Sequence, residues 1–255
     1  MCQHQYLNKN WIEEDKQFYP KRRVDNKISW QKPHIIGSFY SHKMKRTVQY
    51  HSLNECYFYY YLELDHETIR YYVQPVEVPI PILSKIGDKK FWQHVPDVLV
   101  FRNGSKPLLY QIKEAPGDLG EKFLRCNQRC ELMAKEQNWQ YDVIYPKRIP
   151  EVVLENITYL HGYLRHRKYY EYLIDDAIFK VKLGQPMLVN ELAQSFYPAF
   201  NQSEARPLTF HLLAKGLIHT NILEKITGDS VIHIPANSNA NLLDKRFFGK
   251  EEGTE

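Results

Sequence analysis

Residues 95–113 read VPDVLVFRNGSKPLLYQIK, and this stretch decides the fold of the N-terminal half of the chain. Two short apolar runs, VPDVLVF and LLYQIK, flank the dipeptide Asn103-Gly104. Asn-Gly favours a tight hairpin turn, and apolar runs of this length are typical of buried strands. The sequence therefore predicts two antiparallel strands joined at this turn.

The predicted hairpin brings three polar side chains together. Residues two apart in a strand point to the same face, so Gln111 and Lys113 project together and the hairpin brings Asp97 close to both. Phosphodiester hydrolysis uses a divalent cation held by carboxylate and amide oxygens, with a lysine to orient the nucleophile or stabilise the developing charge. We therefore expect Asp97 to be the central metal ligand, Gln111 and the Ile112 carbonyl to be further ligands, and Lys113 to act in catalysis.

A second carboxylate is expected from the helix that begins near residue 52. Ser52-Leu53-Asn54-Glu55 matches the capping-box pattern, and an aromatic run from residue 57 to residue 64 follows it. Glu55 is thus a candidate catalytic residue and metal ligand. It is equally well explained as the glutamate that caps its own helix, because a cap ties the carboxylate to a backbone N–H.

The other candidates also have structural alternatives. Asp97 fits a turn at a strand end, and Lys113 fits a solvated strand end, although Asp is depleted in apolar strands. Glu77 is the first reserve carboxylate and Glu114 the second. Gln74, which precedes Pro75, is expected to shape the site without taking part in the chemistry.

Elements around the hairpin predict an α/β domain over residues 1–149. Residues 1–35 show little periodicity and predict an irregular lead-in, and residues 36–50 predict a basic connector leading to a strand. A helix between two strands predicts a right-handed crossover onto one sheet. The further expected elements are a helix at 52–64, strands at 69–73 and around 76–80, a helix at 118–138 and a strand at 141–145.

Pro146 and Pro150 mark a boundary, after which residues 150–236 predict a winged-helix-like α+β domain. Its presumed recognition helix, residues 204–215, carries few cations, which favours protein docking over reading a DNA groove. Residues 237–255 predict a flexible tail. The expected elements are helices at 152–165, 168–181, 188–196 and 204–215, then a strand pair with its turn at residues 227–229.

Charge is unevenly distributed along the chain. Residues 1–50 carry 10 Lys/Arg and 4 Asp/Glu, although the net charge of the whole chain is only +4. A basic segment that is rich in aromatic residues suits contact with a phosphate backbone, and a solvated arm is the alternative. The candidate DNA-binding residues are Arg22, Arg23, Lys43, Lys45 and Arg46.

Composition excludes several classes of protein. No stretch approaches the roughly 20 apolar residues of a membrane helix, and no apolar signal core follows Met1, so a cytoplasmic location is expected. Four cysteines are too few for a disulfide scaffold, and they lack the spacing of a zinc site. The histidines likewise form no spaced metal set.

Five segments together resemble one family, the TnsA endonuclease subunits of heteromeric, Tn-seven-like DNA transposases. The segments are GSFYSHKMKR at 37–46, SLNE at 52–55, VQPV at 73–76, PDV at 96–98 and QIK at 111–113. Gln111, where most related nucleases have Asp or Glu, is itself a feature of that family. The resemblance covers roughly residues 35–145.

The resemblance implies a restriction-endonuclease-like fold of the PD-(D/E)xK type and a bacterial, nucleoid-associated enzyme. It implies a Mg²⁺-dependent subunit, with Mn²⁺ as a substitute, that cuts the 5′ ends of a transposon in double-stranded DNA. A TnsB-type transposase would act on the 3′ ends, and a TnsC-type ATP-dependent regulator would bind, through the C-terminal region. The alternatives are a free-standing restriction-like or junction-cutting nuclease and a non-catalytic DNA-binding scaffold.

Overall fold

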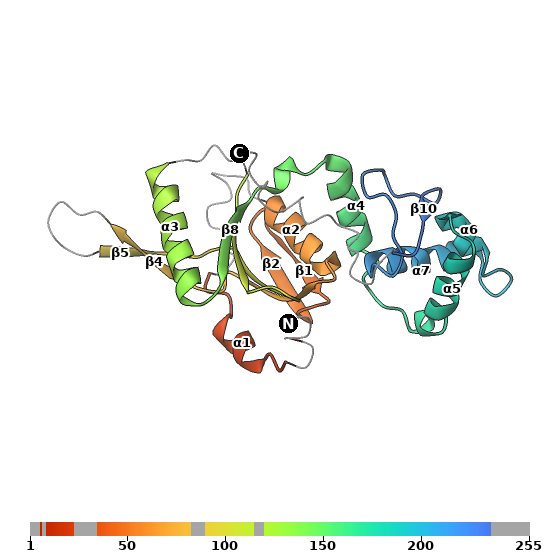
Figure 1. Cartoon of the computed structure of the whole chain (residues 1–255), viewed down its shortest axis with the longest axis horizontal. Helices are drawn as coiled ribbons and strands as arrows, with labels where there is room; N and C mark the ends of the chain where they lie inside the picture. The colour runs from red at the N-terminus through yellow and green to blue at the C-terminus, as the bar shows by residue number, and fades with distance from the viewer. Residues whose placement is uncertain (1–5, 7–8, 23–34, 83–89, 115–119, 236–255) are drawn as a thin grey trace. The chain divides into compact units, whose positions relative to one another are not determined.

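The computed structural model of the chain describes residues 6, 9–22, 35–82, 90–114 and 120–235 (Figure 1). It shows a mixed α/β fold, as the sequence predicts. The chain divides into two compact units. The first contains Met1–Phe58 and Glu67–Lys147, and the second contains Tyr59–His66 and continues from Arg148.

A four-stranded sheet forms the centre of the first unit, in the order β3-β6-β7-β8. Antiparallel pairs join β3 (Thr68–Val73) to β6 (Val98–Arg102) and β6 to β7 (Leu108–Ile112), whereas β8 (Gln140–Ile144) runs parallel to β7. Strand β6 is almost continuously apolar because both of its faces are covered, and Val98, Leu99 and Val100 are fully buried. The predicted hairpin is thus confirmed, with a connection of five residues, 103–107.

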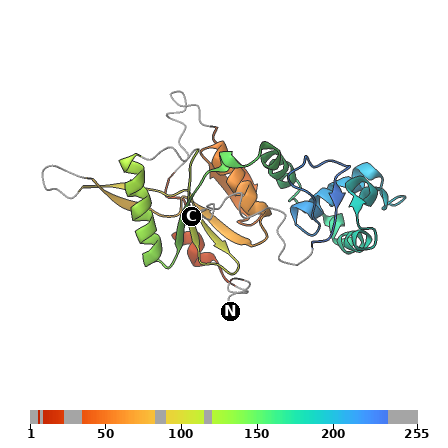
Figure 2. The same ribbon diagram turned by 45° about the horizontal axis from the view of Figure 1, so that its top comes forward.

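The parallel pair is connected by helix α3 (Glu121–Glu136), which runs beside β8 (Figure 2). Its buried face carries Cys126, Cys130 and Ala134 at helical spacing. The two cysteines pack against Val78 and Ile80 in an apolar cluster. They are free thiols in the core.

Two hairpins flank the sheet, and the sequence predicted neither in full. β1 (Gly37–Ser41) pairs with β2 (Arg46–Tyr50) where the sequence predicted a basic connector leading to a strand. β4 (Val78–Ile82) pairs with β5 (Lys90–His94), a strand that was not predicted. Antiparallel pairing satisfies the backbone of these polar segments even though they bury few apolar side chains.

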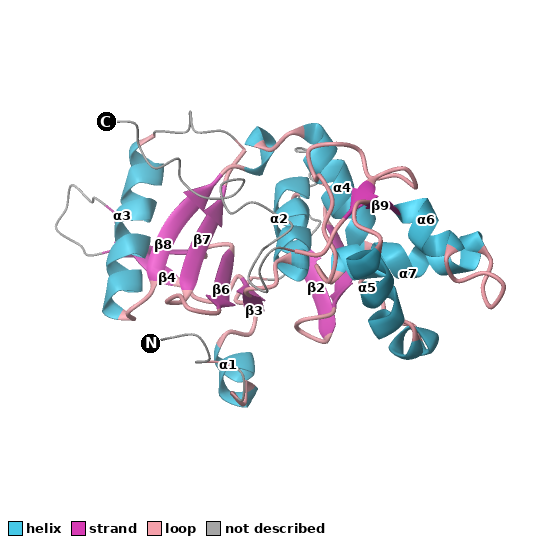
Figure 3. Ribbon diagram, turned by 45° about the vertical axis from the view of Figure 1, so that its right-hand side comes forward, coloured by secondary structure: helices cyan, strands magenta, loops and turns pink. Residues whose placement is uncertain are grey.

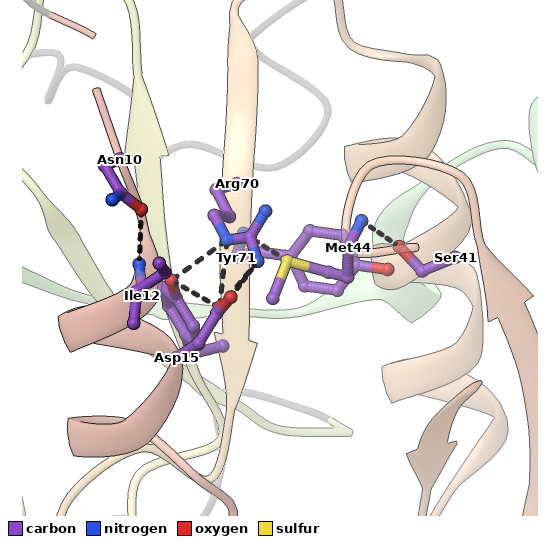
Figure 4. Close-up of polar contacts among 8 residues, drawn as sticks. Asn10, Ile12, Asp15, Ser41, Met44, Arg70 and Tyr71 are labelled. Atoms are coloured by element: carbon purple, nitrogen blue, oxygen red, sulfur yellow. Dashed lines mark hydrogen bonds and ion pairs between the residues drawn. The ribbon is translucent and has the colours of Figure 1, made fainter. Parts of the chain in front are cut away.

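The N-terminal region also contains a helix, α1 (Ile12–Gln17), so the prediction of a wholly irregular lead-in was wrong. Arg70 on β3 donates hydrogen bonds from Nη2 to both carboxylate oxygens of Asp15, at 2.6 and 2.5 Å (Figure 4). Burial alone would raise the pKa of Asp15, but hydrogen bonds from Arg70 and Tyr72 outweigh it and lower the pKa. This charged pair fixes α1 to the sheet.

The second unit is mainly helical (Figure 3). The predicted pairing around residue 228 differs in detail, because β10 (Val231–Ile232) pairs with β9 (Met187–Leu188), and His219 and His233 form a single bridge. The predicted tail lies outside the described residues. The helices are the C-terminal part of α2 (Leu53–Leu64), α4 (Glu151–His161), α5 (Ile174–Leu183), α6 (Val189–Gln194) and α7 (Gln202–Ala214), with short 3₁₀ turns at Pro146–Arg148 and Lys168–Tyr172.

Helix length and composition also bear on membrane insertion. None of the helices in the described ranges is long and apolar enough to cross a membrane.

Candidate active site

The register of β6 and β7 brings Asp97 and Gln111 into direct contact. The backbone N–H of Asp97 donates to the Tyr110 carbonyl at 3.0 Å, which extends the β6–β7 pairing by one residue. Oδ2 of Asp97 then accepts hydrogen bonds from the Ile112 N–H at 2.6 Å and from Nε2 of Gln111. For Ile112, the group that contacts Asp97 is therefore the N–H, whereas the sequence suggested the carbonyl as a metal ligand.

Gln74, whose backbone is hydrogen-bonded to that of Asp97, has an unusual conformation. Gln74 has φ of 49°, in the left-handed region that non-glycine residues seldom adopt. Its N–H donates to the Asp97 carbonyl at 2.8 Å, and its carbonyl accepts from the Lys21 N–H at 2.9 Å. Gln74 thus ties Asp97 to the N-terminal segment through its backbone.

Glu55 forms the helix cap and also lies near Asp97. The Glu55 N–H donates to Oγ of Ser52 at 3.2 Å, and the Glu55 carboxylate accepts from the His51 N–H at 3.0 Å and from the Ser52 hydroxyl at 3.3 Å. Burial raises the pKa of Asp97, and the negative charge of Glu55 raises it further. Glu55 therefore caps its helix and at the same time places a negative charge close enough to act on Asp97.

Gln111 carries an unsatisfied acceptor inside the site. Its side chain is buried, and Oε1 has no hydrogen-bond partner of good geometry in the described part of the chain. The side chain lies beside His94, whose pKa is lowered by burial, with Gln111 opposing that effect as a hydrogen-bond partner and Lys113 adding to it. A buried oxygen without a hydrogen-bond partner, on a side chain that contacts Asp97, is a feature that a bound cation would explain.

Lys113 and Gln111 line one cavity of about 310 Å³. The Lys113 N–H donates to the Ile144 carbonyl at 2.9 Å, which fixes the end of β7 against β8. Its Nζ lies 5.1 Å from the centre of the Phe123 ring, and the side chain is half-buried. A half-buried lysine that lines this cavity can reach a substrate phosphate bound there.

Other residues that line the same cavity were not among the predicted site residues, notably Trp92, His94 and Lys122. Nζ of Lys122 lies 4.7 Å from the Trp92 ring centre, and the Trp92 and His94 rings meet edge to face at 5.8 Å. The spacing of two between Trp92 and His94 would have put them on one face, had β5 been recognised as a strand.

The predicted DNA-binding residues have different environments. Arg22 is exposed and lines a second cavity of about 300 Å³ together with Arg46, and the charge of Arg22 partly opposes the rise in the pKa of Asp97 that burial causes. Nζ of Lys43 instead donates to the Thr68 carbonyl at 2.5 Å, and Lys45 is exposed in the β1–β2 turn. Arg23 lies outside the described residues.

The donor set suits a hard cation and differs from common metal clusters. Within the described ranges, no group of three His, Cys, Asp or Glu side chains is arranged to hold a metal ion. The predicted set of metal ligands has only two carboxylates, Glu55 and Asp97. The amide of Gln111 is the third side chain of the set. All three offer oxygen atoms, which Mg²⁺ prefers. The reserve residues Glu77 and Glu114 are exposed.

Comparison with known proteins adds no family assignment. No protein-family model matches the chain, and none of the curated proteins matches its sequence.

Proposed function

We propose that the first unit is a Mg²⁺-dependent DNA endonuclease of the restriction-endonuclease-like fold. The observation that carries the proposal is the contact between the side chains of Asp97 and Gln111, with the charge of Glu55 acting on Asp97 and with Oε1 of Gln111 buried without a hydrogen-bond partner among the described residues. Lys113 lines the adjoining cavity. A hairpin of two apolar strands, a helix and a parallel strand is the scaffold on which such nucleases place these residues.

The residues have distinct roles in the proposed reaction. Glu55, Asp97 and Gln111 would hold the cation through oxygen atoms, and the bound cation would polarise the phosphate and lower the pKa of the attacking water. Lys113 would place its positive charge against the phosphate oxygens as negative charge grows on them. The Ile112 N–H fixes the Asp97 carboxylate, so that it needs little reorganisation during the reaction.

We propose further that this nuclease is the TnsA-type subunit of a cut-and-paste transposase in a bacterial cytoplasm. The resemblance in residues 35–145 supports this, as does the second unit, whose order of α5, β9, α6, α7 and β10 is typical of a winged helix. That unit would contact a TnsC-type regulator. The test is cleavage of transposon-end DNA with Mg²⁺ by the chain alone and with a TnsB-type transposase.

The two nuclease hypotheses differ in the outcome of that test. A transposase subunit cuts the 5′ ends only when the partner transposase and transposon ends are present. A free-standing nuclease cuts DNA unaided with Mg²⁺. A chain that binds DNA and cuts under neither condition is a scaffold, and the nuclease proposal then fails.

Two substitutions separate the two roles of Glu55. Ser52→Ala removes the cap and is expected to lower the free energy of unfolding by about 1 kcal/mol with little effect on cleavage. Glu55→Gln keeps an acceptor for the His51 N–H but removes the charge, so cleavage is expected to fall roughly a hundredfold, about 2.7 kcal/mol, with stability nearly unchanged. Urea unfolding and the cleavage assay measure both. If Glu55→Gln cuts normally, the carboxylate is only a cap.

The orientation of the Gln111 amide gives a further prediction. In the structure Nε2 faces Asp97, but a cation on Asp97 requires Oε1 there, which turns Nε2 toward the imidazole of His94. His94 would then position the amide by accepting from it. Outer partners of metal ligands typically change affinity 10- to 100-fold, so His94→Leu is expected to weaken Mn²⁺ binding about tenfold.

The control is the same substitution in a Gln111→Glu chain. Both oxygens of a carboxylate can face a cation, so His94→Leu is expected to change Mn²⁺ affinity less than about twofold there. Electron paramagnetic resonance titration of Mn²⁺ measures all four chains without requiring cleavage. Equal weakening in both backgrounds would mean that His94 only packs against its neighbours.

A further inference from the structure

The second unit concentrates its positive charge in one short segment, residues 165–168. Over residues 59–66 and 148–235 the chain has 9 Lys/Arg against 11 Asp/Glu, so this unit is slightly acidic. Three of those cations, Arg165, Arg167 and Lys168, fall within four consecutive positions that also include His166. All four side chains are exposed. We call residues 165–168 the basic loop.

The basic loop is anchored on both sides by buried residues. Before it, the Tyr163 carbonyl lies 2.6 Å from Nδ1 of the buried His211, and Leu164 is buried. After it, the buried Tyr170 stacks at an angle on His211, with ring centres 4.8 Å apart. The backbone of the loop is therefore held against α7 while its cations face solvent, so binding an anion would order few additional groups.

The cations surround a cavity of about 630 Å³ and are mostly free to bind. Nη1 of Arg167 donates to the Tyr169 hydroxyl at 3.3 Å, and His166 lies 3.3 Å from the Glu171 carboxylate. Arg165 and Lys168 have no hydrogen-bond or ion-pair partner in the part of the chain that the structure describes. Both line the cavity, as does Arg167.

Helix α7 is a poor alternative for contact with nucleic acid. Eight of its residues are buried, including every position from Leu208 to Ala214, so it presents little surface to a DNA groove. Its exposed N-terminal turn carries Glu204, which would repel phosphate. A DNA contact in this unit must therefore come from elsewhere, and the basic loop has the required charge.

We propose that the basic loop binds the phosphate backbone of double-stranded DNA, as a second DNA contact of the chain. The proposal rests on the proposed function only in taking DNA as the substrate. The loop offers two arginines and a lysine, and such side chains hold phosphates without reading sequence. It would fix the DNA on the protein and leave the choice of bond to the first unit and its partners.

The test compares two double variants of the full chain with equal loss of charge. Arg165→Ala/Lys168→Ala removes the two cations that lack partners. Lys182→Ala/Lys225→Ala removes two exposed lysines from other parts of the same unit. Binding to a fluorescent DNA duplex is measured by anisotropy in EDTA at several salt concentrations, so that no cleavage occurs. Circular dichroism checks that both variants fold.

Each phosphate contact contributes about 0.9 to the slope of log affinity against log salt. We expect the slope of the basic-loop variant to be shallower by about 1.8. Between 50 and 200 mM salt, the factor by which its affinity falls is then about ten times smaller than the factor for the wild type. The lysine control is expected to keep the wild-type slope. An unchanged slope in the basic-loop variant, an equal change in the control, or no DNA binding by the wild type would each overturn the proposal.

Two further readouts separate this inference from neighbouring ideas. If the slope changes as expected but the complete reaction yields no cleavage, the basic loop stands as a DNA contact and the nuclease proposal fails. If the slope is unchanged while the basic-loop variant loses retention on immobilised polyglutamate, the loop binds an acidic protein surface and the proposal is wrong.

Discussion

The Asp97→Asn chain is expected to lose at least about a thousandfold in 5′-end cleavage, equivalent to roughly 4 kcal/mol of transition-state stabilisation. Asparagine keeps an oxygen that accepts from the Ile112 N–H, so the end of β7 stays in place. It removes the negative charge that would hold the cation. It also removes the repulsion with Glu55, so the folded state should not be weakened. Cleavage is measured with transposon-end DNA and the partner transposase.

Asp142→Asn provides the matched control. Asp142 is a half-buried carboxylate on β8 of the same sheet, and its Oδ1 accepts from the Val143 N–H at 2.8 Å. It does not line the cavity that contains Gln111 and Lys113. Cleavage by this variant is expected to stay within about threefold of wild type, because asparagine at this position keeps the oxygen that accepts from the Val143 N–H and lies outside the cavity. An Asp97→Asn chain that kept a tenth of wild-type cleavage would contradict the assignment of Asp97.

Lys113→Ala is expected to lower kcat about 100- to 1000-fold and to leave DNA binding nearly unchanged. Removing one group that stabilises developing charge typically has an effect of this size. The backbone N–H that pairs with Ile144 is unaffected by the substitution, and the half-buried side chain leaves little empty space in the core. Single-turnover cleavage separates the chemical step from binding.

Lys122→Ala tests whether any cation of the same cavity would serve. Nζ of Lys122 lies over Trp92 and lines the cavity that Lys113 lines. We expect this variant to weaken DNA binding modestly and to keep kcat within about threefold, because one exposed phosphate contact contributes little to the chemical step.

Failure of the Lys113→Ala chain to assemble with the partner transposase, rather than a failure to cut, would assign Lys113 a structural role.

The central sheet could be predicted because its signals are local. Most residues in the apolar runs that became β6 and β7 are buried, and α3 shows its apolar positions at helical spacing. Helix α1 could not be predicted in the same way. It has six residues and no buried position, and it is stabilised by a charged pair between Asp15 and Arg70, 55 residues apart.

The hairpins β1–β2 and β4–β5 could not be predicted in full from the sequence for a related reason. Their strands are polar or interrupted by proline, so each depends on its partner strand for backbone hydrogen bonds. Strand β5 carries no β-branched residue, and its partner strand β4 contains two prolines. Without that pairing, nothing in the sequence places His94 and Trp92 beside Gln111.

The candidate site was largely accessible from the sequence. The rule that residues two apart share a face places Gln111 and Lys113 on one cavity, and strand register brings Asp97 to Gln111. The capping-box pattern also indicated the cap that Glu55 forms. The lack of a hydrogen-bond partner for Oε1 of Gln111 among the described residues could not be predicted, because it depends on three-dimensional packing rather than on residue type or spacing.

The conformation of Gln74 has a consequence for how this protein can change over evolutionary time. A left-handed residue other than glycine or asparagine is unfavourable by roughly 1–2 kcal/mol, so replacing Gln74 with glycine would relieve this strain and make the chain more tolerant of heat. Glycine would also loosen the backbone that fixes Asp97. Selection for thermal robustness and selection for precise cutting therefore act on position 74 in opposite directions, and a heat-adapted descendant would have to find its extra stability elsewhere.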